Sequence, residues 1–221
     1  VTVSVHPSAQ TTAPHGPTVG FAAQLALLAV LATTTGLGGA GWFVGTTYAL
    51  AVCAMLGHAL RRSGARSLGP ANQVTLARAT LVGGVAALVA ESLGGPVPIA
   101  VVVALAAVAL LLDGVDGKVA RRTGTASTVG ARFDMEVDAF LILVLSVFVA
   151  QDLGIWVLAI GLTRYAFVAA SFVLPWLTAP LPPAMWRKTV AAVQGIVLTV
   201  AASGLLPRLL AVLVVALALA R

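Results

Sequence analysis

Eight apolar segments follow one another along this chain and constrain its fold more than any other feature. Short joins rich in Gly and Pro separate them. They lie near residues 19–36, 40–60, 73–91, 96–113, 135–151, 153–175, 188–205 and 207–220. Their lengths fit helices, and a run of about 20 apolar residues can cross a bilayer. The alternation of a membrane β-barrel is absent from the sequence. We therefore predict an all-α, polytopic integral membrane protein.

The charge content agrees with this fold class. Of the 221 residues, 60% are hydrophobic and only 9% are charged, whereas soluble domains carry about 25% charged residues. The net charge is +6, but the basic residues stand at the ends of the apolar segments. There they set topology and meet anionic lipid headgroups, so the charge does not indicate nucleic-acid binding.

The basic residues also predict sidedness. With eight crossings, all three basic loops fall on one side of the membrane; their residues are Arg61, Arg62 and Arg66, then Lys118, Arg121, Arg122 and Arg132, then Arg187 and Lys188. The positive-inside rule makes this side cytoplasmic. We expect a bacterial-type cytoplasmic membrane, with both termini and the loops near residue 120 in the cytoplasm.

Composition divides the chain into four parts. Residues 1–18 are a polar tail that we expect to be disordered and, lacking a basic n-region, not to be a cleaved signal. Residues 19–60 contain no charged side chain and form a predicted transmembrane hairpin. Residues 61–71 are a basic cytoplasmic linker, and 72–221 a six-helix membrane domain. The hairpin either supports a homodimer or holds the flank of the site.

Five of the seven acidic residues lie between Asp113 and Asp138. Carboxylates are costly in hydrocarbon, so such a cluster indicates a functional site. Asp113 and Asp116 are three residues apart, and Asp134 and Asp138 are four apart, so each pair shares one face of a helix. Two antiparallel helices joined by a turn at 122–130 would bring the pairs together.

Four adjacent carboxylates repel one another unless cations lie between them. Ligand sets made only of oxygen favour magnesium, manganese or calcium. Two such ions would suit a pyrophosphate substrate. One alternative of another class is a divalent-cation or proton-coupled transporter that uses the same carboxylates.

The acidic segment resembles the signature of the CDP-alcohol phosphotransferase family, D-x-x-D-G-x-x-A-R-x8-G-x-x-x-D-x-x-x-D. Every position is filled, by Asp113, Asp116, Gly117, Ala120, Arg121, Gly130, Asp134 and Asp138. The six apolar segments from residue 73 onward match that family's six-helix core. The 19–60 hairpin would be an addition to it.

This resemblance implies transfer of a phosphoalcohol from a CDP-linked donor to an acceptor hydroxyl, with release of CMP. It implies a pair of divalent ions, Mg²⁺ or Mn²⁺, held by the four aspartates, with Asp138 also acting as the general base. Cytidine nucleotide binding would fall to Gly117, Ala120, Arg121 and Gly130. We expect a phosphatidyltransferase that uses CDP-diacylglycerol and a small polar alcohol. The alternative within the family is a soluble CDP-alcohol donor and a lipid acceptor.

Polar residues outside the signature leave alternatives open. Asn72, Thr75 and Arg78 have helical spacing and either face the nucleotide or act as an N-cap and a snorkelling arginine. Arg164 stands in an apolar segment and binds either the acceptor's phosphate or a carboxylate. We expect Glu136, between two site aspartates, to point away from them towards a partner at the membrane interface or on a neighbouring helix.

The acceptor is the least constrained part of this interpretation. Basic residues at cytoplasmic ends, namely Arg132, Arg187 and Lys188, would join Arg164 around an anionic acceptor or serve only as topology signals. In relatives that take sugar phosphates or glycerol phosphate, a basic residue usually follows the last aspartate. Here that residue is Ala139, which argues against such an acceptor, while the four basic residues slightly favour an anionic one.

Overall fold

The computed structural model describes residues 15–63, 70–123, 128–174 and 185–220, without the side chains of 15–16, 59–63, 70–72, 116–123, 128–129 and 185–188. The described residues form helices and no strand. The helices are α1 (His15–Thr35), α2 (Gly39–Ser63), α3 (Pro70–Ser92), α4 (Ile99–Thr123), α5 (Thr128–Leu153), α6 (Leu158–Val173), α7 (Met185–Ala202) and α8 (Arg208–Leu219). Each predicted apolar segment corresponds to one of them, which confirms the all-α fold.

Three boundaries differ from the predicted ones for local reasons. The fourth segment begins at Ile99 rather than 96, because Pro96 and Pro98 precede it. It continues to Thr123, well past its apolar part. The sixth segment is interrupted at Gly154, where φ is +107°, and a short 3₁₀ turn (Ile155–Val157) precedes α6. Glycine adopts such a positive φ without steric cost.

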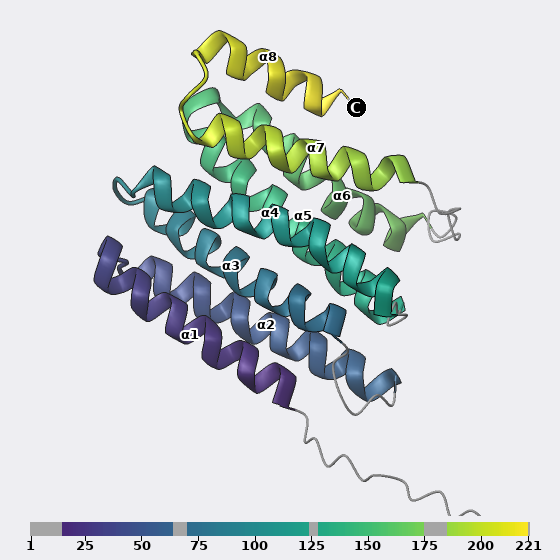
Figure 1. The fold of residues 1–221 in the computed structure, drawn as a ribbon. Coiled ribbons are helices and arrows are strands. Elements are labelled where there is room, and N and C mark those ends of the chain that lie inside the picture. Colours follow the sequence, from purple (N-terminus) through teal and green to yellow (C-terminus); the bar gives the residue numbers. More distant parts are fainter. Residues whose placement is uncertain (1–14, 64–69, 124–127, 175–184, 221) are drawn as a thin grey trace, which may run out of the picture.

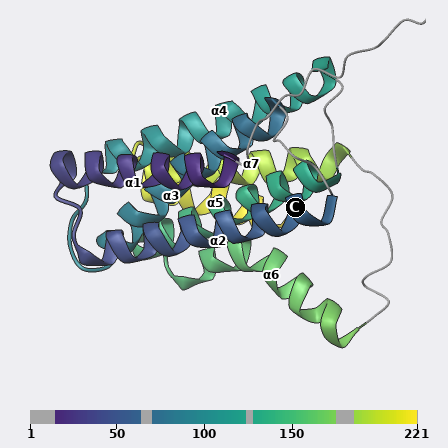
Figure 2. The ribbon, with the colours of Figure 1, turned by 90° about the horizontal axis from the view of Figure 1, so that it is seen from below.

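The helices lie side by side as long rods (Figure 1). The hairpin α1–α2 forms one side of the bundle, α8 the opposite side, and α3, α4 and α5 lie between them. Seen from below, α6 diverges from the other helices (Figure 2). The first hairpin and the last helix are therefore separated by the helices that carry the acidic segment.

Helix α3 is the centre of the packing and contacts α1, α2, α4 and α5. All residues from 82 to 89 are buried, as expected of a helix that is apolar on every side. Gly83, Gly84, Ala86 and Ala87 keep the helix narrow, and small residues let helix backbones approach closely in a membrane. Other helices can therefore surround α3 on several faces.

The hairpin packs directly on α3. A Cβ atom on Gly41 of α2 would lie 3.0 Å from the Ala87 carbonyl oxygen. The Gly41 N–H donates a hydrogen bond of 3.0 Å to the Glu91 carboxylate at the other end of α3 from the acidic segment. A carboxylate at a helix N-terminus is favourable because it meets unpaired N–H groups there. The uncharged hairpin is thus anchored to the six-helix unit.

In the part of the chain that the structure describes, four helical stretches are long and apolar enough to cross a membrane: Pro17–Thr35, Gly39–His58, Gln73–Ser92 and Ile155–Val173. Shorter apolar stretches are Ile99–Val115, Thr189–Ala202 and Arg208–Leu219. Large apolar side chains such as Phe43 and Phe172 face outward. These features indicate an integral membrane protein, while the eight crossings and their sidedness stay predictions.

The predicted domain limits differ from the observed helix boundaries at two places. Helix α1 begins at His15, inside the range 1–18 that we expected to be a tail, and residues 1–14 lie outside the described part. The predicted linker 61–71 includes the end of α2 and the start of α3, with 64–69 outside the described residues. The helical hairpin is thus longer than its apolar core.

Candidate active site

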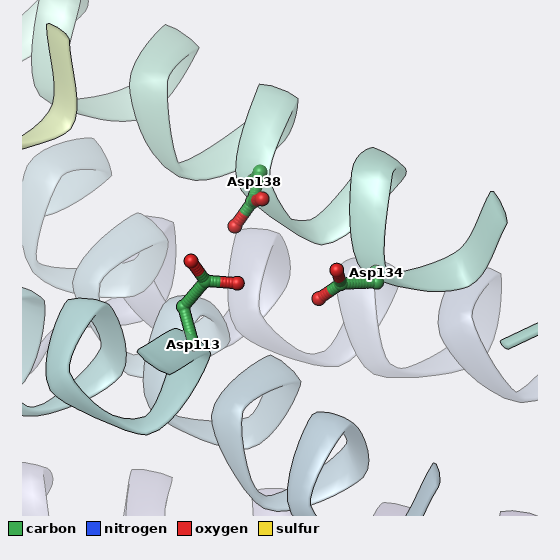
Figure 3. Close-up of side chains that lie close together, drawn as sticks. All are labelled: Asp113, Asp134 and Asp138. Carbon is green, nitrogen blue, oxygen red and sulfur yellow. The ribbon is translucent and has the colours of Figure 1, made fainter. Parts of the chain in front are cut away.

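Three aspartates from two helices come together beside α3. Asp113 lies in the second half of α4, and Asp134 and Asp138 lie one turn apart in the first half of α5. Their carboxylates point towards one another (Figure 3), and one oxygen from each lies within 4.8 Å of the others. The spacing of four residues on α5 places its two aspartates on one face. The sequence predicted that Asp113 would meet Asp134 and Asp138, whereas the side chain of Asp116, the fourth predicted member, lies outside the described residues.

Arg78 of α3 joins the three carboxylates. Its Nη1 lies 2.9 Å from Asp113 Oδ1 and 2.6 Å from Asp134 Oδ1, and its Nη2 donates to Asp138 Oδ1. The Arg78 side chain is only 1% exposed. A guanidinium presents several donors in a fixed plane, so one arginine can orient carboxylates from two helices. Arg78 therefore fixes the positions of the three aspartates relative to α3.

The chemistry of this cluster fits a divalent cation. One guanidinium and three carboxylates carry a net charge of minus two among the described side chains. The donors are all carboxylate oxygens, which magnesium and manganese prefer. The three aspartate side chains are between 15% and 34% exposed, so they can be reached from outside the bundle. Asp113, Asp134 and Asp138 are thus suited to hold a metal ion.

A small open pocket adjoins two of the carboxylates. It lies between α4, α5 and α7 and is lined by Leu110, Asp113, Asp138, Leu141, Ile142, Ala191 and Ala192. Apart from the two carboxylates its walls are apolar. The two alanines keep the α7 wall low, so the pocket joins an acidic group to an apolar surface.

A second ion pair lies on the other side of α5. Arg164 of α6 contacts the Glu136 carboxylate through both Nη2 and Nε, the latter at 3.4 Å. Glu136 is two residues from both Asp134 and Asp138, a spacing that turns it to a different face of the helix. This confirms that Glu136 points away from the aspartates. It also places Arg164 against a carboxylate, one of the two alternatives considered for it.

The other predicted site residues are placed less completely. Asp116, Gly117, Ala120 and Arg121 belong to the last turns of α4, but their side chains lie outside the described part of the chain. The same holds for Asn72 in the first turn of α3, and for Arg187 and Lys188 in the first turn of α7. The motif residues 113–121 therefore share one helix, and their joint action on a nucleotide stays a prediction.

Three further predicted residues are described. Thr75 is buried one turn before Arg78 on α3, so it lies near the aspartate cluster along the helix. Gly130 and Arg132 belong to the first turns of α5, and Arg132 is exposed. Exposure leaves Arg132 accessible to an anionic acceptor or to lipid headgroups, and its role stays a prediction.

The sequence did not establish that Arg78 belongs to the centre of the site. The alternative of a snorkelling arginine is wrong, because the side chain is buried among carboxylates and does not reach the bilayer surface. The available signal was the register. Arg78 follows Thr75 by three residues and lies within the apolar stretch Gln73–Ser92, where an unpaired arginine would be costly.

The fold and the site define a helical membrane protein with a carboxylate centre suited to divalent cations. The sequence model of the CDP-alcohol phosphatidyltransferase family matches residues 69–220 of this chain. The chain belongs to this family and is therefore a CDP-alcohol phosphotransferase of phospholipid synthesis. No curated protein and no solved structure matches the chain. Family membership favours a transferase over the transporter that the carboxylates alone would allow.

Proposed function

We propose that this protein transfers a phosphatidyl group from CDP-diacylglycerol to the hydroxyl of a small polar alcohol and releases CMP. The observation that carries the proposal is the cluster of Asp113, Asp134 and Asp138 in a chain of this family. The small pocket between α4, α5 and α7 places Asp113 and Asp138 beside apolar walls. A donor with a charged pyrophosphate and two acyl chains matches this combination. The chain would admit the lipid from the membrane and the acceptor from the cytoplasm.

In this mechanism the oxygen of the acceptor hydroxyl attacks the phosphatidyl phosphorus, and the bond from phosphorus to CMP breaks. Asp138 takes the hydroxyl proton, which makes the oxygen a stronger nucleophile. Arg78 keeps Asp138 in place through its Nη2 contact. Asp113, Asp116, Asp134 and Asp138 would hold the cofactor, a pair of Mg²⁺ or Mn²⁺ ions. When bound, these ions offset the charge of the pyrophosphate and make CMP a better leaving group.

Nucleotide recognition belongs to the part of the site at the end of α4. Gly117 and Ala120 have little or no side chain, so the cytidine of the donor can approach the helix backbone. Arg121 and Gly130 complete the motif, and Thr75 and Asn72 would approach from α3. The acceptor would be bound near Arg132, Arg164, Arg187 and Lys188. Because Glu136 already compensates Arg164, a strongly anionic acceptor is less favoured.

The test is CMP release from CDP-diacylglycerol by the purified protein, with Mg²⁺ or Mn²⁺. The acceptor panel is glycerol 3-phosphate, inositol, inositol phosphate, serine and no acceptor. We expect metal-dependent CMP release with one acceptor and none after chelation. Asp116→Asn should abolish transfer, and Asp138→Asn should lose turnover while it still binds CDP-diacylglycerol.

Asp152→Asn is the matched control, because Asp152 is exposed at the far end of α5. Its activity should equal that of the unchanged protein. Full activity of Asp138→Asn would refute the assigned base. Transfer only from a soluble CDP-alcohol to diacylglycerol would refute the proposed donor in favour of the alternative direction. Failure to bind either donor would contradict both.

A further inference from the structure

Tyr48 of α2 contacts the helix that carries the site aspartates. Its ring stacks on the ring of Phe140 of α5, with centroids 4.6 Å apart and an interplanar angle of 14°. Phe140 follows Asp138 by two residues. Stacked aromatic pairs contribute beyond the area they bury. An aromatic contact therefore joins the hairpin to α5 close to the proposed base.

The other end of Tyr48 is enclosed between α1, α2 and α3. The Tyr48 hydroxyl is buried, and no hydrogen-bond partner for it is found among the described residues. It lines a small pocket with Gln24, Leu76, Ala79 and Thr80, between α1, α2 and α3. Tyr48 thus lies where α2, α3 and α5 meet, and it shares this pocket with Ala79, which follows Arg78 in the chain.

The helix that carries Tyr48 is fixed firmly enough to act as a support. A Cβ atom on Gly45, one turn before Tyr48, would lie 3.3 Å from the Cβ of Ala87 in α3. Gly41 donates its N–H to Glu91 of the same helix. These contacts set α2 against α3, and α3 carries Arg78. A side chain that reaches from α2 to α5 can therefore fix α5 relative to Arg78.

We propose that Tyr48 is a positioning residue for Asp138. Its ring holds α5 at the rotation about the helix axis at which Asp134 and Asp138 meet Arg78 and Asp113. The hairpin, which lies outside the family domain at 69–220, is on this inference a working part of the enzyme. The effect on turnover rests on the proposed function of Asp138. A misplacement of about 1 Å can lower a rate about a hundredfold, so a small rotation of α5 is sufficient.

The experiment compares Tyr48→Leu, which removes the ring, with Tyr48→Phe, which keeps it. The full chain is purified in detergent, and two quantities are measured. One is CMP release, separated into kcat and KM for the donor. The other is the Mn²⁺ concentration that gives half of the metal-induced increase in melting temperature. The second quantity reports on the aspartates without any turnover.

We expect Tyr48→Leu to lower kcat with little change in KM. The Mn²⁺ midpoint should increase about threefold to tenfold, as expected for the loss of one aromatic pair. Tyr48→Phe should stay within about twofold of the unchanged protein, because the hydroxyl bonds to no described residue and the ring contact remains. Phe140→Leu should resemble Tyr48→Leu. The double variant should be no worse than either single one, since both remove the same contact.

Phe43→Leu is the matched control, because Phe43 is on the same helix and its side chain is 72% exposed. It should leave kcat and the Mn²⁺ midpoint unchanged. The inference is overturned if Tyr48→Leu alters only the melting temperature, or if Tyr48→Phe is as impaired as Tyr48→Leu. If the unchanged protein releases no CMP but the Mn²⁺ midpoints differ as expected, the proposed function fails and the positioning role holds.

Discussion

Replacement of Arg78 by methionine tests how the acidic centre is held together. Arg78→Met keeps a long side chain but removes a buried charge that contacts Asp113, Asp134 and Asp138. Removal of one partner from a buried ion pair costs about 3–5 kcal/mol. We expect the lower end, about 3 kcal/mol, because the aspartates keep some exposure to solvent.

The assay is thermal unfolding of the purified protein, with chelator and with Mn²⁺. A cost of about 3 kcal/mol should lower the melting temperature by about 6–12 °C for a chain of this size. Mn²⁺ should raise the melting temperature of Arg78→Met more than that of the unchanged protein. The reason is that the variant's three carboxylates have lost their compensating charge and the ion relieves their repulsion.

Two further variants sharpen the test. Arg78→Lys keeps the charge but has a single ammonium group, so it should fall between the unchanged protein and Arg78→Met. Arg208→Met removes an exposed arginine at the start of α8 and should change the melting temperature little. An Arg78→Met protein that melts with the unchanged protein, or that Mn²⁺ does not stabilise further, would refute the role given to Arg78.

Two further predictions concern contacts between helices. Glu91→Gln should cost about 1 kcal/mol of stability, because the hydrogen bond from Gly41 then loses its charged acceptor; an unchanged melting temperature would contradict this. Gly161→Ala should cost about 1–3 kcal/mol, since a Cβ there would lie 2.5 Å from the Leu143 Cα and α6 must shift. A melting temperature at or above that of the unchanged protein would show that α6 accommodates the methyl group.

The fold was predictable because apolar runs and Gly/Pro joins determine where membrane helices begin and end. The polar ends of α4 and α5 carry no hydropathy signal. Their limits followed instead from the spacing of the aspartates, which placed the connecting turn at 122–130, and the helices end at Thr123 and begin at Thr128. Helices α4 and α5, which carry the site aspartates, thus have the limits that composition alone predicts least well.

Some contacts between side chains could likewise be predicted from the sequence, and others could not. The meeting of Asp113 with Asp134 and Asp138 followed from spacings of three and four residues and a short connection. The contact of Arg78 with Asp138 spans 60 residues, and its existence depends on which face α3 turns towards α5. Periodicity cannot supply that face for a helix that is apolar all round. The stack of Tyr48 on Phe140 was missed for the same reason.

The buried Arg78 also bears on how the protein is made. During synthesis α3 enters the membrane before α4 and α5, and its arginine then has none of its three aspartate partners. A charged residue at the centre of an isolated helix costs about 2.5–3.5 kcal/mol on insertion scales, and one nearer the start, as Arg78 is in the stretch Gln73–Ser92, costs less. The penalty ends only when α5 arrives and Asp134 and Asp138 join Asp113 around the guanidinium. We therefore expect α3, α4 and α5 to leave the insertion machinery as one unit, with the preceding hairpin already in lipid to receive them.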